Sequence, residues 1–270
     1  MKIEFAFSTC PNDTFMFDAI INRKVDTEGI DFCPIYADIA KLNEWSLDAK
    51  YDMTKLSYNA FTFCVKNYYL LDAGSALGYN CGPILIKKKE TILSEKSQIG
   101  IPGRYTTANM LMDIFFPEYN NRKEIIFSDI EQQLIDNKID AGLIIHESRF
   151  SYIKKGLVKI KDLGESWQQL VGLPIPLGGV VINRKFSKEI YDKVNRVLKR
   201  SIQFALDNPY CSMDYIISHA QEMDKEMIKN HIKLYVNDFS LSLREEGKKA
   251  IRKIFVLTGK SAKGIFKKTI

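Results

Sequence analysis

Apolar residues in the first half of the chain form short uninterrupted runs, each followed by a polar loop and an amphipathic stretch. Residues 2–8 predict a strand, residues 8–14 a polar loop, and the residues from Asp13 or Thr14 onward a helix. Short continuous apolar runs are typical of strands buried on both faces. The same order returns at residues 98–116, so the pattern predicts an α/β fold built from two similar halves.

A later apolar run ends at a histidine. The helical pattern of residues 130–137 leads into residues 140–145, which predict a buried parallel strand, and His146 follows at its end. Ligands of open α/β sheets bind just beyond the carboxyl ends of strands. A histidine there suits proton transfer near neutral pH, and a structural histidine held by hydrogen bonds fits the position equally well.

The order of elements predicts two lobes with a ligand cleft between them. The chain is expected to cross to the second lobe near residues 88–94 and to return near residues 180–182. We therefore predict one discontinuous lobe from residues 1–90 and 180–270, and a second lobe from residues 91–179.

Polar loops at the predicted strand ends are expected to line this cleft. Asn, Asp and Thr side chains at a helix start cap free amide groups, and the same amides bind anions. Capping needs only one such residue, so three in succession favour a ligand site. The predicted lining comprises Asn12, Asp13, Thr14, Lys55, Leu56, Ser57, Thr107, Ala108 and His146.

The last third of the chain is predicted to be helical. An apolar stripe from Ile190 to Ala205 predicts one helix, with Ser187 as its cap. His231 lies on the stripe of a later helix and is expected to be a packed or hinge residue. His219 has no polar neighbours in the pattern, which favours a structural or exposed position.

Composition narrows the class of protein. Hydrophobic residues make up 46% and charged residues 27% of 270 positions, as in globular proteins, and no run is long enough for a membrane span. Five cysteines without a CxxC pair argue against a disulfide framework and a zinc site, and the start of the chain is unlike a signal peptide. These features predict a cytoplasmic protein. The net charge of +6 is scattered, which favours a solvated surface over a nucleic-acid site and would help to gather a small carboxylate.

The motifs of several enzyme classes are absent. The sequence has no GxGxxG, P-loop, HExxH or GxSxG motif, so nucleotide phosphate transfer, hydride transfer and metal hydrolysis have no support. The predicted cleft could bind a carboxylate and a polyol and move one proton. Ser57 or Ser148 could act as a nucleophile with His146, although no third orienting residue is evident.

Several of these segments resemble the 1,4-dihydroxy-6-naphthoate synthase family of menaquinone biosynthesis. The resemblance runs nearly end to end and is carried by STCPNDTF at residues 8–15, residues 54–57, Gly78 with 81–83, 102–103 with 106–108, 145–147, and His231 with 235–237.

The resemblance implies a periplasmic-binding-protein fold of type II and a lyase acting on cyclic dehypoxanthine futalosine without a cofactor. It places the proton-accepting histidine at His146, and substrate contacts at residues 55–57 and at Thr107 with Ala108. Glu147 is expected on the opposite face of the strand, holding the loop.

Two other functions remain open. Chorismate dehydratase would share the fold and an anionic substrate, and the pair His146 and Glu147 argues against it. A solute-binding protein would share the fold alone, since fold does not fix function. The lack of a signal peptide and of a lipidation cysteine argues against that second alternative.

Overall fold

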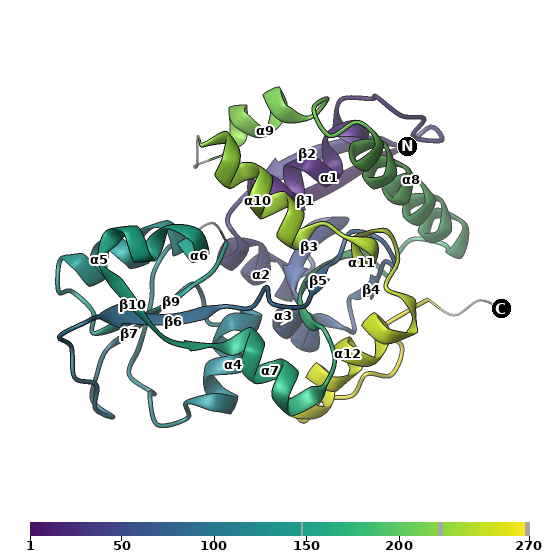
Figure 1. Cartoon of the computed structure of the whole chain (residues 1–270). Coiled ribbons are helices and arrows are strands. Elements are labelled where there is room, and N and C mark those ends of the chain that lie inside the picture. Colours follow the sequence, from purple (N-terminus) through teal and green to yellow (C-terminus); the bar gives the residue numbers. More distant parts are fainter. Residues whose placement is uncertain (147, 221–223, 268–270) are drawn as a thin grey trace.

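The strands of the protein form two sheets, one at the centre of each of two lobes. The computed structural model describes residues 1–146, 148–220 and 224–267. Figure 1 shows the second lobe to the left of the first. The first sheet has the order β2 (Asp31–Tyr36), β1 (Lys2–Phe7), β3 (Met53–Ser57), β11 (Ile175–Asn183) and β4 (Tyr68–Leu70), with β5 (Ala76–Gly78) also paired to β11.

The first sheet is mixed. Strand β1 runs parallel to β2 and β3, and β11 runs antiparallel to β3, β4 and β5. Because β1 and β3 are parallel, their carboxyl ends lie at the same edge. Ser8 and Ser57 are therefore neighbours in the fold, at the edge where the sequence predicts the cleft.

The second sheet is also mixed. Its order is β10 (Leu157–Asp162), β6 (Ile84–Lys88), β9 (Ala141–Ile144), β7 (Ile99–Ile101) and β8 (Arg122–Glu124). Strand β9, which leads to His146, is parallel to β7 and antiparallel to β6, so its predicted parallel pairing holds on one side only.

Helices cover the first sheet on both faces. Helices α1 (Pro11–Ile21), α8 (Lys188–Asp207), α9 (Met213–His219) and α10 (Lys225–Tyr235) pack together, while α2 (Ile39–Leu47), α3 (Tyr58–Cys64) and α12 (Arg244–Leu257) pack against β3 and β11. A short helix, α11 (Asp238–Leu241), lies beside β5. The α8 stripe is buried, and the Ser187 hydroxyl accepts a hydrogen bond from the Ile190 amide, as predicted.

Helices also lie on both faces of the second sheet. Figure 1 shows α5 (Ile130–Ile135) and α6 (Ser148–Ser151) on one face, and α4 (Thr107–Phe115) and α7 (Leu163–Val171) on the other. Two short 3₁₀ turns, Phe127–Asp129 and Tyr152–Lys155, complete this lobe. One apolar cluster runs from Tyr58 in the first lobe to Trp167 in the second, so the lobes share part of their core.

The chain passes between the sheets earlier than predicted. Strand β6 pairs with β9 and β10 of the second sheet, so the passage lies between Gly78 and Ile84 and not at residues 88–94. The return through β11 agrees with the predicted position near residues 180–182. The predicted lobe bounds otherwise stay a prediction.

Other local predictions were wrong. The pattern of residues 124–127 predicts a strand, but β8 ends at Glu124 and Phe127 begins a 3₁₀ turn. Residues 70–79 contain glycines and were predicted to be irregular, but they include the end of β4 and all of β5. The His219 ring is hydrogen-bonded to Ser218 and to the carbonyl of Tyr215, so it has the polar company that the pattern did not indicate.

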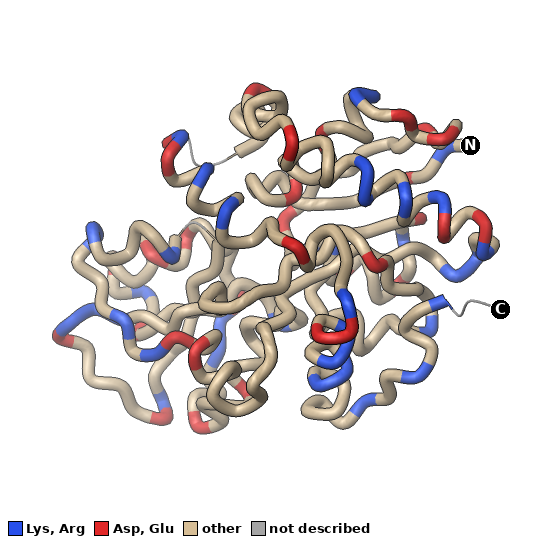
Figure 2. Tube along the Cα trace, turned by 45° about the vertical axis from the view of Figure 1, so that its right-hand side comes forward, with Lys and Arg blue, Asp and Glu red and all other residues tan. Residues whose placement is uncertain are grey.

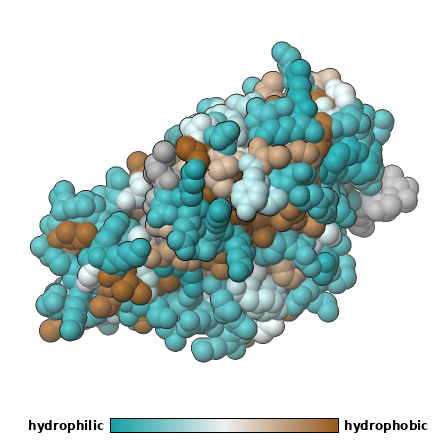
Figure 3. Space-filling model, turned by 45° about the horizontal axis from the view of Figure 1, so that its top comes forward, coloured by the Kyte–Doolittle hydropathy of each residue, from teal (hydrophilic) through white to brown (hydrophobic). Residues whose placement is uncertain are grey.

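The surface is mixed in charge and polarity. Figure 2 shows basic and acidic residues interspersed over both lobes, and Figure 3 shows a largely hydrophilic face interrupted by hydrophobic patches. Within the described ranges, no helix has the length and apolar character needed to cross a bilayer.

Candidate active site

A pocket lies where the strand ends of the two lobes meet. Seven of the nine side chains predicted to line the cleft face it: Asn12, Asp13, Lys55, Ser57, Thr107, Ala108 and His146. Other residues that line the pocket were not predicted from the sequence, among them Ile39, Cys81, Pro83, Leu177, Gly178 and Tyr235.

Two predicted residues turn away from the pocket. Leu56 lies between Lys55 and Ser57 on a strand, so its side chain points to the opposite face and is fully buried in the core. The Thr14 hydroxyl donates to the carbonyl oxygens of Cys10 and Pro11 within its own helix.

The polar side chains at the start of α1 do not cap the helix, although the sequence predicted that they would. The helix begins at Pro11, its N-cap is Cys10, and no side chain caps it. Asn12 and Asp13 therefore do not cap amides, and their polar groups face the pocket instead. Asp13 stands in the first turn, where a negative charge is favoured by the helix dipole.

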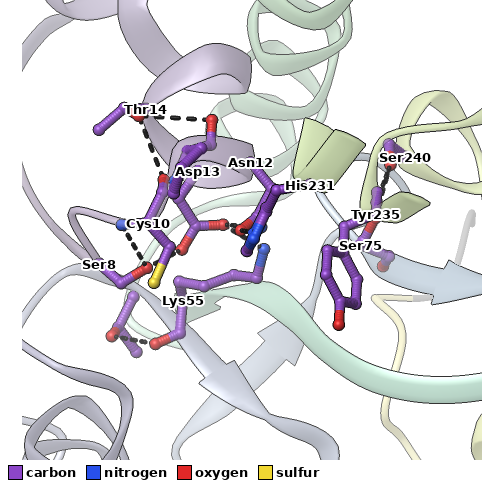
Figure 4. Close-up of polar contacts among 12 residues, drawn as sticks. Ser8, Cys10, Asn12, Asp13, Thr14, Lys55, Ser75, His231, Tyr235 and Ser240 are labelled. Carbon is purple, nitrogen blue, oxygen red and sulfur yellow. Dashed lines mark hydrogen bonds and ion pairs between the residues drawn. The ribbon is translucent and has the colours of Figure 1, made fainter. Parts of the chain in front are cut away.

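Asp13 and Lys55 form a buried ion pair in the pocket. The Lys55 Nζ lies 2.7 Å from Asp13 Oδ1, and the two side chains are only 4% and 3% exposed. Asp13 also accepts hydrogen bonds from the Ser8 hydroxyl at 2.7 Å and from Asn12 Nδ2 at 2.9 Å. Figure 4 shows these groups converging. The carboxylate is thus fully hydrogen-bonded, which is the condition for burying a charge pair.

A second polar network joins the lobes near Ser57. Asn43, a residue that the sequence analysis did not single out, accepts from the Ser57 amide at 2.8 Å and donates to its hydroxyl at 3.0 Å. The Thr107 hydroxyl donates to the Leu177 carbonyl at 2.8 Å and accepts from the Asn59 amide at 3.3 Å. Thr107 therefore ties the start of α4 to α3 and β11.

We expect Thr107→Val to lower the free energy of unfolding by about 1–3 kcal/mol, because it leaves a buried amide and carbonyl without their partner. Urea unfolding at pH 7 measures the change. Thr258→Val is the matched control, since the Thr258 hydroxyl bonds only to carbonyls of its own helix. Equal stability of Thr107→Val and wild type would show that the two bonds contribute nothing.

His146 follows β9 with a left-handed backbone, at φ of 56°. Its ring meets the Phe127 ring at 4.8 Å and an interplanar angle of 64°. Its Nε2 is buried and has no hydrogen-bond partner among the described residues. The sequence alone suggested ordinary titration near neutral pH. Burial instead lowers the pKa of His146 from 6.5 to about 4, with the Asp13 carboxylate acting against this shift and the Lys55 ammonium adding to it.

His231 is fully buried on α10, as the sequence predicted for a packed residue. Its Nε2 lies 2.9 Å from Asn12 Oδ1, and its ring meets that of Tyr235 at 4.7 Å. Burial lowers the pKa of His231 well below its ordinary value, and the neighbouring His146 acts in the same direction. Both imidazoles are therefore neutral at pH 7.

Of the two serines considered as nucleophiles, Ser57 lines the pocket with His146, whereas Ser148 is not among its described lining residues. The Ser57 hydroxyl accepts from Asn43, and burial raises the pKa of the Cys81 thiol to about 12. No group of three His, Cys, Asp or Glu side chains in the described ranges could hold a metal ion. Glu147, predicted to face away from His146, lies outside the described residues.

Comparison with known proteins identifies the family. The profile of a protein family described as "Menaquinone biosynthesis" matches residues 3–260, which is most of the chain. The chain belongs to this menaquinone biosynthesis family. Its predicted resemblance to the naphthoate synthases is thereby confirmed at the level of the family.

Several known proteins are similar to this chain in sequence, in fold or in both. A protein of Thermus thermophilus named 1,4-dihydroxy-6-naphtoate synthase is 36% identical over 94% of this chain and 92% of its own length. The structure of protein AF1704 from Archaeoglobus fulgidus matches with a TM-score of 0.91 and 34% identity, covering 96% of this chain and 97% of that one.

A Candida albicans protein, the CA3427 gene product, is described as having the generic periplasmic binding protein fold. It matches with a TM-score of 0.71 at 12% identity, over 98% of this chain and 93% of its own. At this identity the likeness concerns the fold alone. The predicted periplasmic-binding-protein architecture is therefore confirmed for this member of the menaquinone biosynthesis family.

Proposed function

We propose that the protein is a carbon–carbon lyase that converts cyclic dehypoxanthine futalosine to 1,4-dihydroxy-6-naphthoate, with His146 as general base. The observation that carries the proposal is the half-buried His146 imidazole, whose lowered pKa keeps it neutral and whose Nε2 is buried, in the same pocket as a lysine and two helix starts. The family and the name of the Thermus thermophilus relative support the choice of product.

The pocket offers the groups that a retro-aldol or elimination reaction needs. His146 takes the proton through Nε2, which is buried and has no partner among the described residues. Negative charge that develops beside the substrate carbonyl is stabilised by the Lys55 ammonium, which is preorganised by Asp13. The Lys55 and Asp13 side chains are almost fully buried, so water screens their charges less than it would at the surface.

The substrate carboxylate is assigned to the start of α4. The Thr106 side chain caps the Asn109 amide, and this leaves the amides of Thr107 and Ala108 at the pocket. Free amides and the helix dipole favour an anion at this position. Lys55 is already neutralised by Asp13, so the amides carry the larger share of carboxylate binding.

The decisive experiment incubates the purified protein with cyclic dehypoxanthine futalosine and, in parallel, with chorismate. We expect mass spectrometry to detect 1,4-dihydroxy-6-naphthoate from the first compound and no change in the second. Loss of water from chorismate would instead identify a chorismate dehydratase. Tight binding of either compound without turnover would identify a solute-binding protein.

A further inference from the structure

Two histidine rings from opposite lobes stack at the pocket. His146 follows β9 of the second sheet, while His231 belongs to α10, which packs on α1 and β5 of the first lobe. The ring centroids are 5.8 Å apart and the planes differ by 16°. Phe127 meets the same His146 ring by a T-shaped contact from its own lobe. The His146 ring is therefore packed against Phe127 of its own lobe and against His231 of the other lobe.

Asn12 fixes the orientation of His231. The Asn12 Nδ2 donates to Asp13 Oδ1, so the amide oxygen faces His231 Nε2 at 2.9 Å. The opposite amide orientation would place an oxygen against the Asp13 carboxylate, where no hydrogen bond forms. His231 must therefore donate from Nε2, which defines its neutral tautomer. Figure 4 shows this line of contacts from Ser8 and Asp13 to His231.

We propose that His231 is a positioning residue for His146, and that Asn12 acts by holding His231 instead of contacting the substrate. This inference rests on the proposed role of His146 as the base. Because Nε2 of His146 has no partner among the described residues, packing by Phe127 and His231 sets the direction of that atom. Small errors in such a direction slow an enzyme by large factors.

His231 must also be uncharged to act as the positioning residue for His146. A charged imidazole at His231 would repel the proton that His146 receives, and burial keeps His231 uncharged at pH 7. Among the described residues, the other ionisable side chains that line the pocket are Asp13 on α1, Lys55 on β3, Cys81 and Tyr235 on α10. The Asp13 and Lys55 charges offset each other, so the described side chains around the stack contribute no net charge.

Two substitutions separate positioning from mere packing. His231→Phe keeps a flat ring against His146 and removes the Nε2 donor, whereas His231→Leu removes the ring. We expect kcat to fall about tenfold in His231→Phe and about a hundredfold in His231→Leu, with KM within about threefold of wild type in both. Equal kcat values in His231→Leu and wild type, or a change confined to KM, would overturn the proposal.

Nuclear magnetic resonance tests the same stack without turnover, because the chain has only three histidines. We expect a contact between the ring protons of His146 and His231, a proton on Nε2 of His231 at pH 7, and shifted His146 signals in His231→Phe. His219, outside the pocket, is the internal reference. A proton on Nδ1 of His231, or no ring contact, would overturn the proposal even if wild type is active. An inactive wild type with the expected signals would refute the proposed function alone.

Discussion

We expect the His146→Asn variant to turn over about a hundredfold or more slowly than wild type, with substrate binding largely unchanged. A positioned acid–base group contributes on this scale. Asparagine is uncharged, and the lowered pKa of His146 leaves its imidazole uncharged at pH 7, so the exchange introduces no charge into the pocket. Single-turnover rates and equilibrium binding of the substrate separate the two effects. If the variant turns over within a few-fold of wild type, the base lies elsewhere, and His231 is the next residue to test.

The pH profile gives a second measure of the same residue. A general base works in its unprotonated form, so the rate should rise with pH through the pKa of His146 and then level off. Burial lowers that pKa to about 4 in the ligand-free protein, so we expect kcat/KM to be flat near neutral pH and to fall only as the solution approaches pH 4. The step should be absent in the residual activity of His146→Asn. His219→Gln, which changes a histidine outside the pocket, should keep it.

The hydrophobic pattern of the sequence predicted those helices and strands whose buried residues coincide with its apolar positions. The strand at residues 2–8 and the helix that carries the stripe from Ile190 to Ala205 were found nearly as predicted, because each has a clear pattern and clear flanking loops. Strand β10 and helix α7 were missed. Strand β10 is half exposed and rich in lysine, at an edge of its sheet, so its apolar run is broken.

Long-range pairing explains what the pattern could not show. Strand β6 belongs to the second sheet only because β9 and β10, more than 50 residues later, pair with it. Likewise, Lys55 meets Asp13 across 42 positions and His231 meets Asn12 across 219. The predicted strand ends indicated which residues gather at the pocket. How deeply these residues are buried depends on the packing of the two lobes, and the lowered pKa of His146 follows from that packing.

The buried pair of Asp13 and Lys55 gives the largest expected change in stability. Asp13→Asn keeps the shape of the side chain and removes its charge, so the Lys55 ammonium stays buried without a counterion. Breaking such a pair from one side lowers the free energy of unfolding by about 3–5 kcal/mol, which is a large fraction of the total for an ordinary domain. Urea unfolding at pH 7 measures the change.

Removing both charges should restore much of the loss. The double variant Asp13→Asn with Lys55→Met leaves no buried charge, so we expect it to be more stable than either single variant. The resulting double-mutant cycle isolates the interaction between the two side chains. Lys41→Met is the surface control. Lys41 and its partner Glu44 are both about half exposed, so we expect this variant to unfold at the same urea concentration as wild type although it lacks the ion pair. A single Asp13→Asn variant that unfolds at the same urea concentration as wild type would show that Lys55 is hydrated in solution, and the pocket would then lack the low-dielectric interior that keeps His146 neutral.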